Sequence, residues 1–325
     1  MKDFQNRIAV ITGAGTGMGR ALACQLAAEG CHLALCDLLV ENLEETARLA
    51  RAAATNHLRI STHRCDVAVE EDVLAFRDAV QKEHATESVH LLFNNAGVGG
   101  GGSFVEDSRE GWERTFNICW FGVYYNARAF MPLLVAADQA YIVNTSSVNG
   151  FWASLGPHTA HSAYSASKFA VKGFTEALIT DLRLHAPHVK AAVVMPGHIG
   201  TGIVTNSAKI HGAPDVQEMK GNDFDAVRVR MKRMGIQADA LTEDQVRDLI
   251  RQQAIDFEQN APLTAQGAAS IILDGVRDEK WRILVGDDAQ AIDALVRETP
   301  EEAYELPFHL RVMKIFQEAR KKRTK

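Results

Sequence analysis

The chain has 325 residues, 46% of them hydrophobic, so it is long enough to bury a large core. Its 35 basic and 41 acidic residues give a net charge of −6, which argues against a nucleic-acid partner. Five cysteines without a CxxC pair are typical of reduced thiols, and the polar N-terminus is unlike a signal peptide, so we expect a cytoplasmic protein. The longest apolar stretch, residues 116–137, is interrupted by Arg128 and Pro132, so we predict a buried helix there and no membrane span.

Short apolar strands alternate with helical patterns over the first 200 residues. We predict strands at 8–11, 32–36, 58–64, 89–93, 141–144 and 190–195, and helices at 20–29, 40–54, 70–84 and from Tyr164 to about His185. This alternation favours a parallel sheet with helices on both faces. Right-handed crossovers then give a doubly wound α/β sheet of the Rossmann type.

The pattern changes after Gly202. Residues 203–235 are polar and rich in Gly, Asp and Lys, so we expect irregular structure there. A capping box at Thr242 then predicts a helix to about Asn260. A further helix, a last strand at 281–285 and a helix at 289–297 follow. We therefore predict one Rossmann-type domain over 1–286, with a substrate loop at about 203–260, and a helical extension over 287–325.

The end of the chain is strongly basic. Residues 306–325 carry seven basic residues and one acid, a charge of +6 against −12 for the rest. Such a segment could contact a membrane surface or a partner. Chain ends are more often solvated and frayed, which is what we expect here.

A glycine-rich turn lies between the first strand and the first helix, with the sequence Thr12-Gly13-Ala14-Gly15-Thr16-Gly17-Met18-Gly19. In a dinucleotide site Gly13 would allow the tight turn, Gly17 would admit a pyrophosphate, and Gly19 would let helix and strand pack closely. The helix N-terminus would supply free N–H groups to the phosphates. A plain strand-to-helix connection has the same composition, so the turn alone decides little.

An acid at the end of the second strand supports the dinucleotide interpretation. Asp37 can accept hydrogen bonds from both hydroxyls of an adenosine ribose and would repel a 2′-phosphate. Neither Thr16 nor Leu38 is basic, so no cation is evident for that phosphate. The sequence therefore predicts NAD rather than NADP as the cofactor. A helix-capping carboxylate is the alternative role of Asp37.

Tyr164 and Lys168 form an i, i+4 pair on one helix face. A free phenol has a pKa of about 10, so acid/base work near pH 7 requires roughly 4 kcal/mol. A cation about 4 Å away at an effective dielectric near 20 supplies ~4 kcal/mol. The pair is therefore suited to proton transfer, although alone it could equally be a surface contact.

Together these motifs resemble the short-chain dehydrogenase/reductase family, over about residues 3–201 and more loosely 261–286. Further family motifs match, in order, at Cys65-Asp66-Val67, Asn94-Asn95-Ala96-Gly97, Asn117 with Gly122, Asn144-Thr145-Ser146-Ser147 and Pro196-Gly197-His198-Ile199-Gly200-Thr201. The resemblance implies cofactor contacts by Gly13, Gly15, Thr16, Gly17, Met18, Gly19, Asp37, Leu38, Asp66, Val67, Asn95, Ala96, Gly97, Tyr164, Lys168, Pro196, Gly197, Ile199 and Thr201.

The resemblance also implies a catalytic set. Tyr164 would exchange a proton with the substrate oxygen, and Lys168 would lower its pKa and hold the nicotinamide ribose. Ser147 would orient the substrate oxygen, and Asn117 would hold a water linking Lys168 to solvent. The hydride would pass directly between nicotinamide C4 and the substrate carbon, so no metal is expected.

The segment between the serine and the tyrosine is slightly longer than is usual in the family. If this insertion displaced Ser147, its role would pass to Ser146 or Ser154; we expect Ser147 to keep it because it directly follows a strand. His158 and His161 in the insertion are three residues apart without an evident third ligand. We interpret them as solvated loop residues.

The sequence thus predicts an oxidoreductase that transfers a hydride between NAD(H) and a secondary alcohol or ketone. A long substrate loop suits a bulky or apolar small molecule, with Phe151, Trp152 and Met195 as candidate pocket walls. The resemblance implies a homodimer or homotetramer. An NAD(H)-binding sensor or scaffold without turnover is the alternative, although neither would need the catalytic set.

Overall fold

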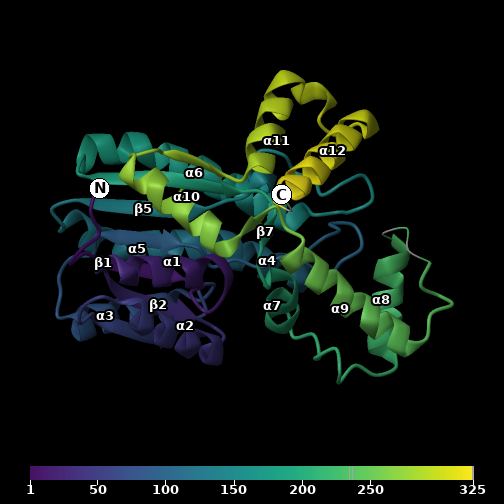
Figure 1. The fold of residues 1–325 in the computed structure, drawn as a ribbon, viewed down its shortest axis with the longest axis horizontal. Coiled ribbons are helices and arrows are strands. Elements are labelled where there is room, and N and C mark those ends of the chain that lie inside the picture. Colours follow the sequence, from purple (N-terminus) through teal and green to yellow (C-terminus); the bar gives the residue numbers. More distant parts are fainter. Residues whose placement is uncertain (234, 236, 324–325) are drawn as a thin grey trace.

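Seven parallel strands form one sheet in the computed structural model, which describes residues 1–233, 235 and 237–323. The strand order is β3-β2-β1-β4-β5-β6-β9 (Figure 1). The strands are β1 (Ile8–Thr12), β2 (His32–Asp37), β3 (Ile60–Arg64), β4 (Leu91–Asn94), β5 (Ala140–Thr145), β6 (Val189–Pro196) and β9 (Arg282–Val285). The predicted doubly wound α/β fold is confirmed.

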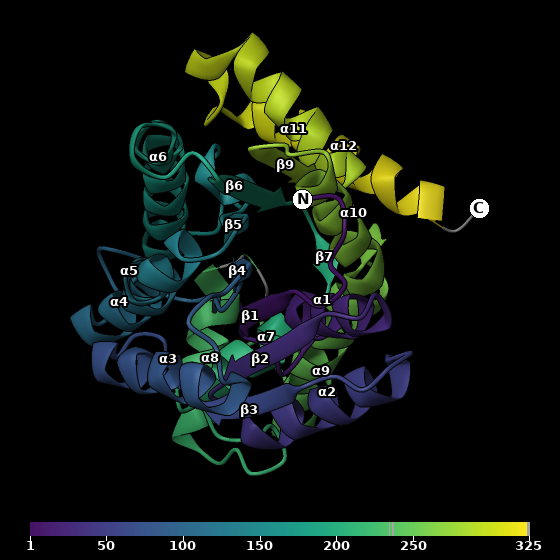
Figure 2. The ribbon, with the colours of Figure 1, turned by 90° about the vertical axis from the view of Figure 1, so that its left-hand side faces the viewer.

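Helices cover both faces of the sheet (Figure 2). One face carries α1 (Gly17–Ala28), α2 (Val40–Ala53) and α10 (Ala265–Arg277), and the other carries α3 (Glu70–His84), α5 (Gly122–Val135) and α6 (Ser162–His185). Alternate side chains of each strand enter the two cores: Ile11 packs on the first face and Val10 on the second. Burial on both faces explains why the strands read as continuous apolar runs.

The strand order reverses beside β1, which pairs with β2 on one side and β4 on the other. Helices that follow these two strands leave toward opposite faces, so a crevice opens at the carboxyl ends of the strands. Helix α4 (Arg109–Phe116) and the π-helical turn Asn117–Phe121 lie between β4 and α5. This arrangement places the predicted motifs at one edge of the sheet.

The segment expected to be irregular is mostly helical, so that prediction was wrong. It contains α7 (Ile203–Ile210) and α8 (Asn222–Arg233). With α9 (Glu243–Gln259), where a helix was predicted, they form a helical segment over 203–260 that extends away from the sheet in Figure 1. The predicted capping box at Thr242 starts α9. A parallel pair of short strands, β7 (Ile199–Gly200) and β8 (Leu263–Thr264), joins the two ends of this helical excursion.

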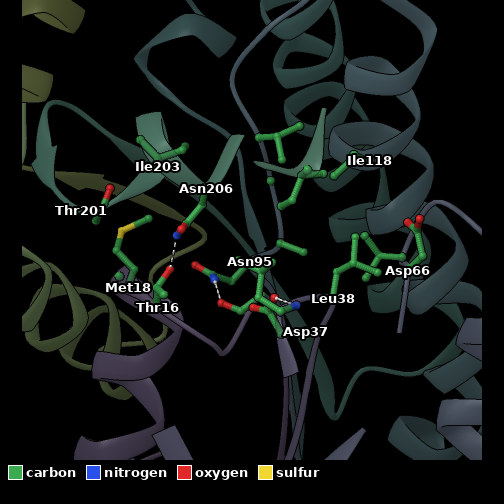
Figure 3. Close-up of a pocket in the computed structure, with 18 of the residues that line it drawn as sticks. Thr16, Met18, Asp37, Leu38, Asp66, Asn95, Ile118, Thr201, Ile203 and Asn206 are labelled. Carbon is green, nitrogen blue, oxygen red and sulfur yellow. Dashed lines mark hydrogen bonds between the residues drawn. The ribbon is translucent and has the colours of Figure 1, made fainter. Parts of the chain in front are cut away.

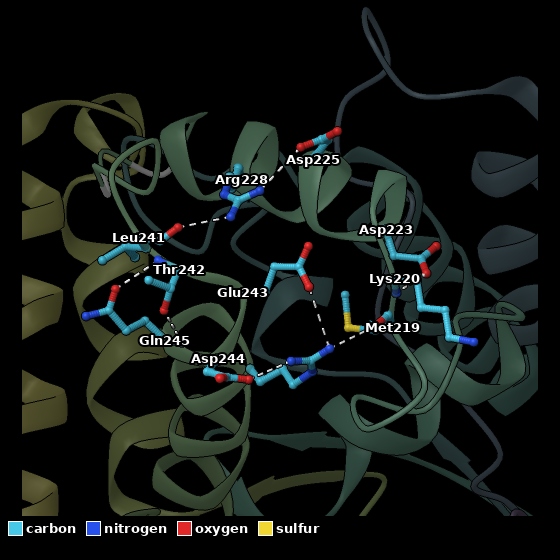
Figure 4. Close-up of polar contacts among 11 residues, drawn as sticks. Met219, Lys220, Asp223, Asp225, Arg228, Leu241, Thr242, Glu243, Asp244 and Gln245 are labelled. Atoms are coloured by element: carbon cyan, nitrogen blue, oxygen red, sulfur yellow. Dashed lines mark hydrogen bonds and ion pairs between the residues drawn. The ribbon is translucent and has the colours of Figure 1, made fainter.

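The helical excursion, residues 203–260, has a small core of its own that its polar composition does not predict. Phe224 and Val246 are fully buried between α8 and α9. The Arg247 guanidinium lies 4.7 Å from the Phe224 ring centre and donates to the Met219 carbonyl. Figure 4 shows Arg228 reaching the Leu241 carbonyl across the same unit. The aliphatic parts of these arginine side chains therefore cover apolar residues, although the many charged residues of the segment suggest a solvated loop.

The C-terminal extension is also ordered, which corrects the expectation of a frayed tail. It forms α11 (Asp287–Glu298) and α12 (Leu306–Arg323); residues 324–325 lie outside the described residues. Phe308 and Val312 of α12 are buried against Trp152. With Ile315 and Ala319 they follow a spacing of three or four residues, which forms an apolar stripe along the helix between the basic residues. No helix in the described ranges is long and apolar enough to cross a membrane.

Candidate active site

A pocket lies in the crevice at the carboxyl ends of β1 to β4 (Figure 3). Twelve of the predicted cofactor residues line it: Gly13, Thr16, Gly17, Met18, Asp37, Leu38, Asp66, Val67, Asn95, Ala96, Gly97 and Thr201. The other seven lie outside this lining: Gly15, Gly19, Tyr164, Lys168, Pro196, Gly197 and Ile199.

The glycine turn has the close packing that its sequence predicts. Gly13 and Gly17 have φ values of +63° and +54°, a backbone conformation that residues with a Cβ atom rarely adopt. A Cβ atom on Gly19 would lie 2.2 Å from the Gly13 carbonyl oxygen. Helix α1 begins at Gly17, so its free N–H groups are at the pocket.

Asp37 combines a structural role with a place in the pocket. One carboxylate oxygen accepts the Gly15 N–H (2.8 Å) and the other accepts the Leu39 N–H (2.9 Å), beside the start of α2. Burial raises the pKa of Asp37, and these N–H donors oppose that rise. A carboxylate offers about four acceptor positions, so two remain for hydroxyl groups of a ligand.

The cations near the pocket are already engaged. Arg114 is the one basic side chain in the described lining, and it pairs with Asp66 at 2.7 Å. Arg20 donates to the Gly15 carbonyl (2.6 Å) and to Thr46 Oγ1 (2.9 Å). No motif pointed to Arg114; the sequence analysis also missed these lining residues: Leu39, Val98, Ile118, Ile203, Asn206 and Ile210.

Helix α7 covers one side of the pocket. Asn206 Nδ2 donates to Thr16 Oγ1 at 2.8 Å, as Figure 3 shows. The next residue, Ser207, accepts the Gly99 N–H at 2.8 Å. Ile203 and Ile210 face the pocket from the same helix, since their spacing puts them on one side. The start of the excursion therefore contacts both the glycine turn and the loop after β4.

The predicted serine, tyrosine and lysine lie beyond β5 and at the start of α6. Lys168 is buried; its ammonium donates to the Thr145 carbonyl (2.8 Å) and lies 5.4 Å from the Tyr164 ring centre. Ser147 Oγ accepts the Asn149 N–H at 3.1 Å. Ser146 instead donates to the Lys168 carbonyl, so its hydroxyl serves packing.

Cys119, in the π-helical turn, and Lys168 both approach Gly97. A side chain built on Gly97 would meet the Lys168 ammonium at 3.4 Å and Cys119 Sγ at 3.8 Å. Cys119 Sγ is 3.3 Å from the Val98 carbonyl oxygen. Asn117 lines a shallow surface pocket with charged residues of α4: Arg109, Glu110, Glu113 and Arg114. The spacing of two residues along the turn separates the two side chains.

A buried acid fixes the predicted nicotinamide segment. Asp288, at the start of α11, accepts the His198 N–H at 2.7 Å. A Cβ atom on Gly197 would lie 2.3 Å from both Asp288 oxygens, so only glycine allows this approach. Burial raises the pKa of Asp288. The sequence analysis missed this residue, which lies 90 positions from its partner.

His161 is not the solvated loop residue that we expected. Its ring centre lies 4.7 Å from that of Tyr164, and burial lowers its pKa to about 4. His158 is exposed. Within the described part of the chain, no group of three or more His, Cys, Asp or Glu side chains could hold a metal ion.

Comparison with known proteins decides the family. The sequence profile of the short-chain dehydrogenases matches residues 7–211, more than half of the chain. The chain belongs to the short-chain dehydrogenase/reductase family. The family assignment makes it an oxidoreductase, and a nicotinamide dinucleotide is the typical cofactor of such enzymes.

Relatives within this family match most of the chain. A protein of Mycobacterium tuberculosis provisionally named the oxidoreductase SadH is 34% identical, over 91% of this chain and 92% of its own length. A solved short-chain dehydrogenase/reductase from Burkholderia phymatum in complex with NAD is 31% identical, covers 93% of this chain and 96% of its own, and has a TM-score of 0.73. A metagenomic short-chain oxidoreductase in complex with NADP is 31% identical over 60% of this chain and 83% of its own (TM-score 0.53).

Proposed function

We propose that this short-chain dehydrogenase/reductase transfers a hydride between NAD(H) and a secondary alcohol or ketone. The observation that carries the proposal is the continuity of one site. The pocket beside the glycine turn holds Asp37, and Lys168 touches the same loop after β4 through Gly97. Tyr164 lies against that lysine. A sensor or scaffold would not require Tyr164 and Lys168 beside the cofactor pocket.

The pocket fits a dinucleotide. The positive φ angles at Gly13 and Gly17 keep side chains out of the turn, and α1 directs its free N–H groups there. Asp37 has two acceptor positions left for the adenosine ribose hydroxyls. A 2′-phosphate would meet this carboxylate, and Arg20 and Arg114 are engaged elsewhere. These contacts favour NAD, as bound by the Burkholderia relative, over NADP.

The chain's own residues then handle the proton. A bound nicotinamide supplies or accepts the hydride at its C4 atom. The Tyr164 hydroxyl gives a proton to the substrate oxygen during reduction and takes it back during oxidation. The buried Lys168 ammonium, held by the Thr145 carbonyl, stabilises the phenolate form. The Ser147 hydroxyl follows β5 and is placed to orient the same oxygen.

Within the turn Asn117–Phe121, we propose that Cys119 is the residue next to Lys168. Its thiol shares the space above Gly97 with the lysine and contacts the Val98 carbonyl. The role that the sequence assigned to Asn117 is thus proposed for its neighbour two residues on.

The substrate is proposed to be bulky or apolar. Ile118 and, from α7, Ile203 and Ile210 form an apolar side of the crevice that holds the proposed dinucleotide site, and a substrate bound beside the cofactor would meet this side. Homo-oligomerisation, a dimer or tetramer, is proposed from the half-exposed aromatic side chains on α4 to α6. These include Trp120 and Tyr124, the latter 38% exposed.

The test is the absorbance of reduced nicotinamide with aliphatic, alicyclic, steroidal and aryl secondary alcohols, each with NAD and with NADP. Turnover with NAD supports the proposal and begins to define the substrate. Turnover with NADP alone contradicts the role of Asp37 and keeps the enzyme class. Tight NAD binding without turnover across the panel favours a sensor.

A further inference from the structure

The ring of His161 lies against the ring of Tyr164. The two ring centres are 4.7 Å apart and the planes are tilted by 34°. His161 is the residue directly before α6, and its backbone carbonyl accepts the Ser165 N–H at 3.1 Å. Its place beside the proposed acid/base is therefore set by the helix start.

The loop that carries His161 is fixed from two sides. The Ser162 N–H donates to the Gly102 carbonyl at 2.9 Å, and the Ala163 N–H donates to the Gly101 carbonyl at 3.1 Å. The Ser162 hydroxyl also accepts from the Trp112 indole at 3.0 Å. The backbone that carries the imidazole is thus fixed by hydrogen bonds at residues 161, 162 and 163.

The imidazole is polar, half-buried and without a hydrogen bond to any other described residue. Burial lowers its pKa to about 4, with no charged group contributing, so the ring is neutral near pH 7. A neutral imidazole presents one N–H donor and one acceptor nitrogen. The His161 nitrogens are not among the buried, unpartnered polar atoms of the described residues, so they remain accessible to solvent and to a ligand bound beside Tyr164.

We propose that His161 is a specificity-determining residue that hydrogen-bonds a second oxygen of the substrate, on the carbon next to the reacting one. Because the His161 ring packs directly against the Tyr164 ring, the substrate atoms that can hydrogen-bond the imidazole are close to the reacting carbon. The substrate class is then a secondary alcohol or ketone with a vicinal oxygen, such as an α-hydroxy ketone, an α-diketone or a 1,2-diol. This inference rests on the proposed function and narrows its substrate.

The experiment compares two aryl ketones that differ only in that oxygen: 1-phenyl-1,2-propanedione and 1-phenyl-1-propanone. Binding of each to the NADH complex is measured by calorimetry, and reduction is measured by loss of NADH absorbance. The intact enzyme is expected to prefer the dione by about tenfold, the worth of one hydrogen bond. His161→Phe keeps an aromatic ring against Tyr164 and removes both nitrogens, so this preference should vanish while affinity for the monoketone stays.

His158→Phe is the matched control, because His158 is an exposed histidine of the same segment. It should leave the preference intact. His161→Asn retains a hydrogen-bonding group, and partial retention of the preference supports the proposal even if the Phe variant does not fold. An equal preference in the intact enzyme and His161→Phe, or no preference at all, overturns it. A preference seen in binding without reduction of either ketone would uphold His161 as a binding residue and contradict the proposed function.

Discussion

The two ends of the proposed active site are built in different ways. The cofactor end is built mainly on the ends of adjacent strands within the first hundred residues, and side-chain contacts to backbone N–H groups join them. Thr12 Oγ1, for example, accepts the N–H groups of both Asn95 and Ala96 at 3.0 Å. The nicotinamide and substrate end joins segments far apart in the chain through side chains: Asp288 accepts the His198 N–H, and the Trp152 indole donates to the Ala303 carbonyl at 2.7 Å.

This difference has a functional consequence. A backbone cradle leaves no room for added volume, so substitutions there should disturb cofactor binding directly. A site held by side chains from α11 and α12 can be altered from a distance while the cofactor pocket stays intact. The residues that bind the dinucleotide and the residues that shape the substrate site thus come from different parts of the fold. Substitutions at each end test this separation.

The largest loss of NAD affinity is expected at Gly19. Gly19→Ala places a methyl group 2.2 Å from the Gly13 carbonyl, which is backbone and cannot rotate away. Overpacking should cost about 1–3 kcal/mol of stability, and distortion of the turn should weaken NAD binding about a hundredfold. Calorimetric titration with NAD and thermal unfolding measure both. Gly173→Ala is the control: this exposed position in α6 has open space around it, so NAD affinity should not change.

Trp152 tests the other end. Trp152→Ala removes a buried indole that packs against Phe308 and should lower the free energy of unfolding by about 3–5 kcal/mol. It should also raise KM for the substrate and leave NAD affinity within about twofold. Trp281→Ala, at a tryptophan that is 43% exposed, should change neither greatly. Equal losses of NAD and substrate binding in Trp152→Ala would show that the two ends are not separate.

Asp37 sharpens the assignment of the cofactor. Asp37→Ala combined with Leu38→Arg removes an acceptor for the ribose hydroxyls and adds a cation for a 2′-phosphate. The ratio of kcat/KM with NAD to that with NADP should fall by about 10–100-fold, since hydrogen bonds to charged groups contribute about 1.5–3 kcal/mol. Asp181→Ala, an exposed acid on α6, is the control. An unchanged ratio would refute the role of Asp37.

A smaller effect should distinguish Cys119 from Asn117. Cys119→Ala removes the contact with the Val98 carbonyl and opens space beside Lys168, so kcat should fall about tenfold with NAD affinity unchanged. Cys119→Ser should retain most of the activity because a hydroxyl can donate to the same carbonyl. Asn117→Ala, in the surface pocket, should leave kcat near normal. If Asn117→Ala lowered kcat more than Cys119→Ala, the role beside Lys168 would belong to Asn117.

The sequence predicted the fold and the cofactor pocket because both follow from local patterns. A strand, a glycine turn and a helix occupy consecutive residues, so the positions of Gly13, Gly17 and Asp37 could be inferred without knowing tertiary contacts. The same holds for Tyr164 and Lys168, which one helical turn brings together.

The sequence could not predict contacts between distant segments. Arg114 pairs with Asp66 across 48 positions, and Trp152 meets Ala303 across 151. The helix at 222–233 was missed because its polar composition is typical of loops, and its few apolar residues pack against α9 in a small core. The helix at 203–210 was missed because its isoleucines face the pocket rather than a core of its own. In the π-helical turn, spacing alone could not decide whether position 117 or 119 lies beside the lysine.

The most direct test of the central claim is the effect of Tyr164→Phe on turnover and on cofactor binding in one preparation. We expect the NAD dissociation constant to stay within about threefold, because Tyr164 lies outside the lining of the dinucleotide pocket. Reduction of the best ketone substrate should fall by about 10²–10⁴-fold, as expected when a general acid is removed. Activity close to that of the unaltered enzyme would contradict proton transfer by Tyr164, and with it the proposed mechanism.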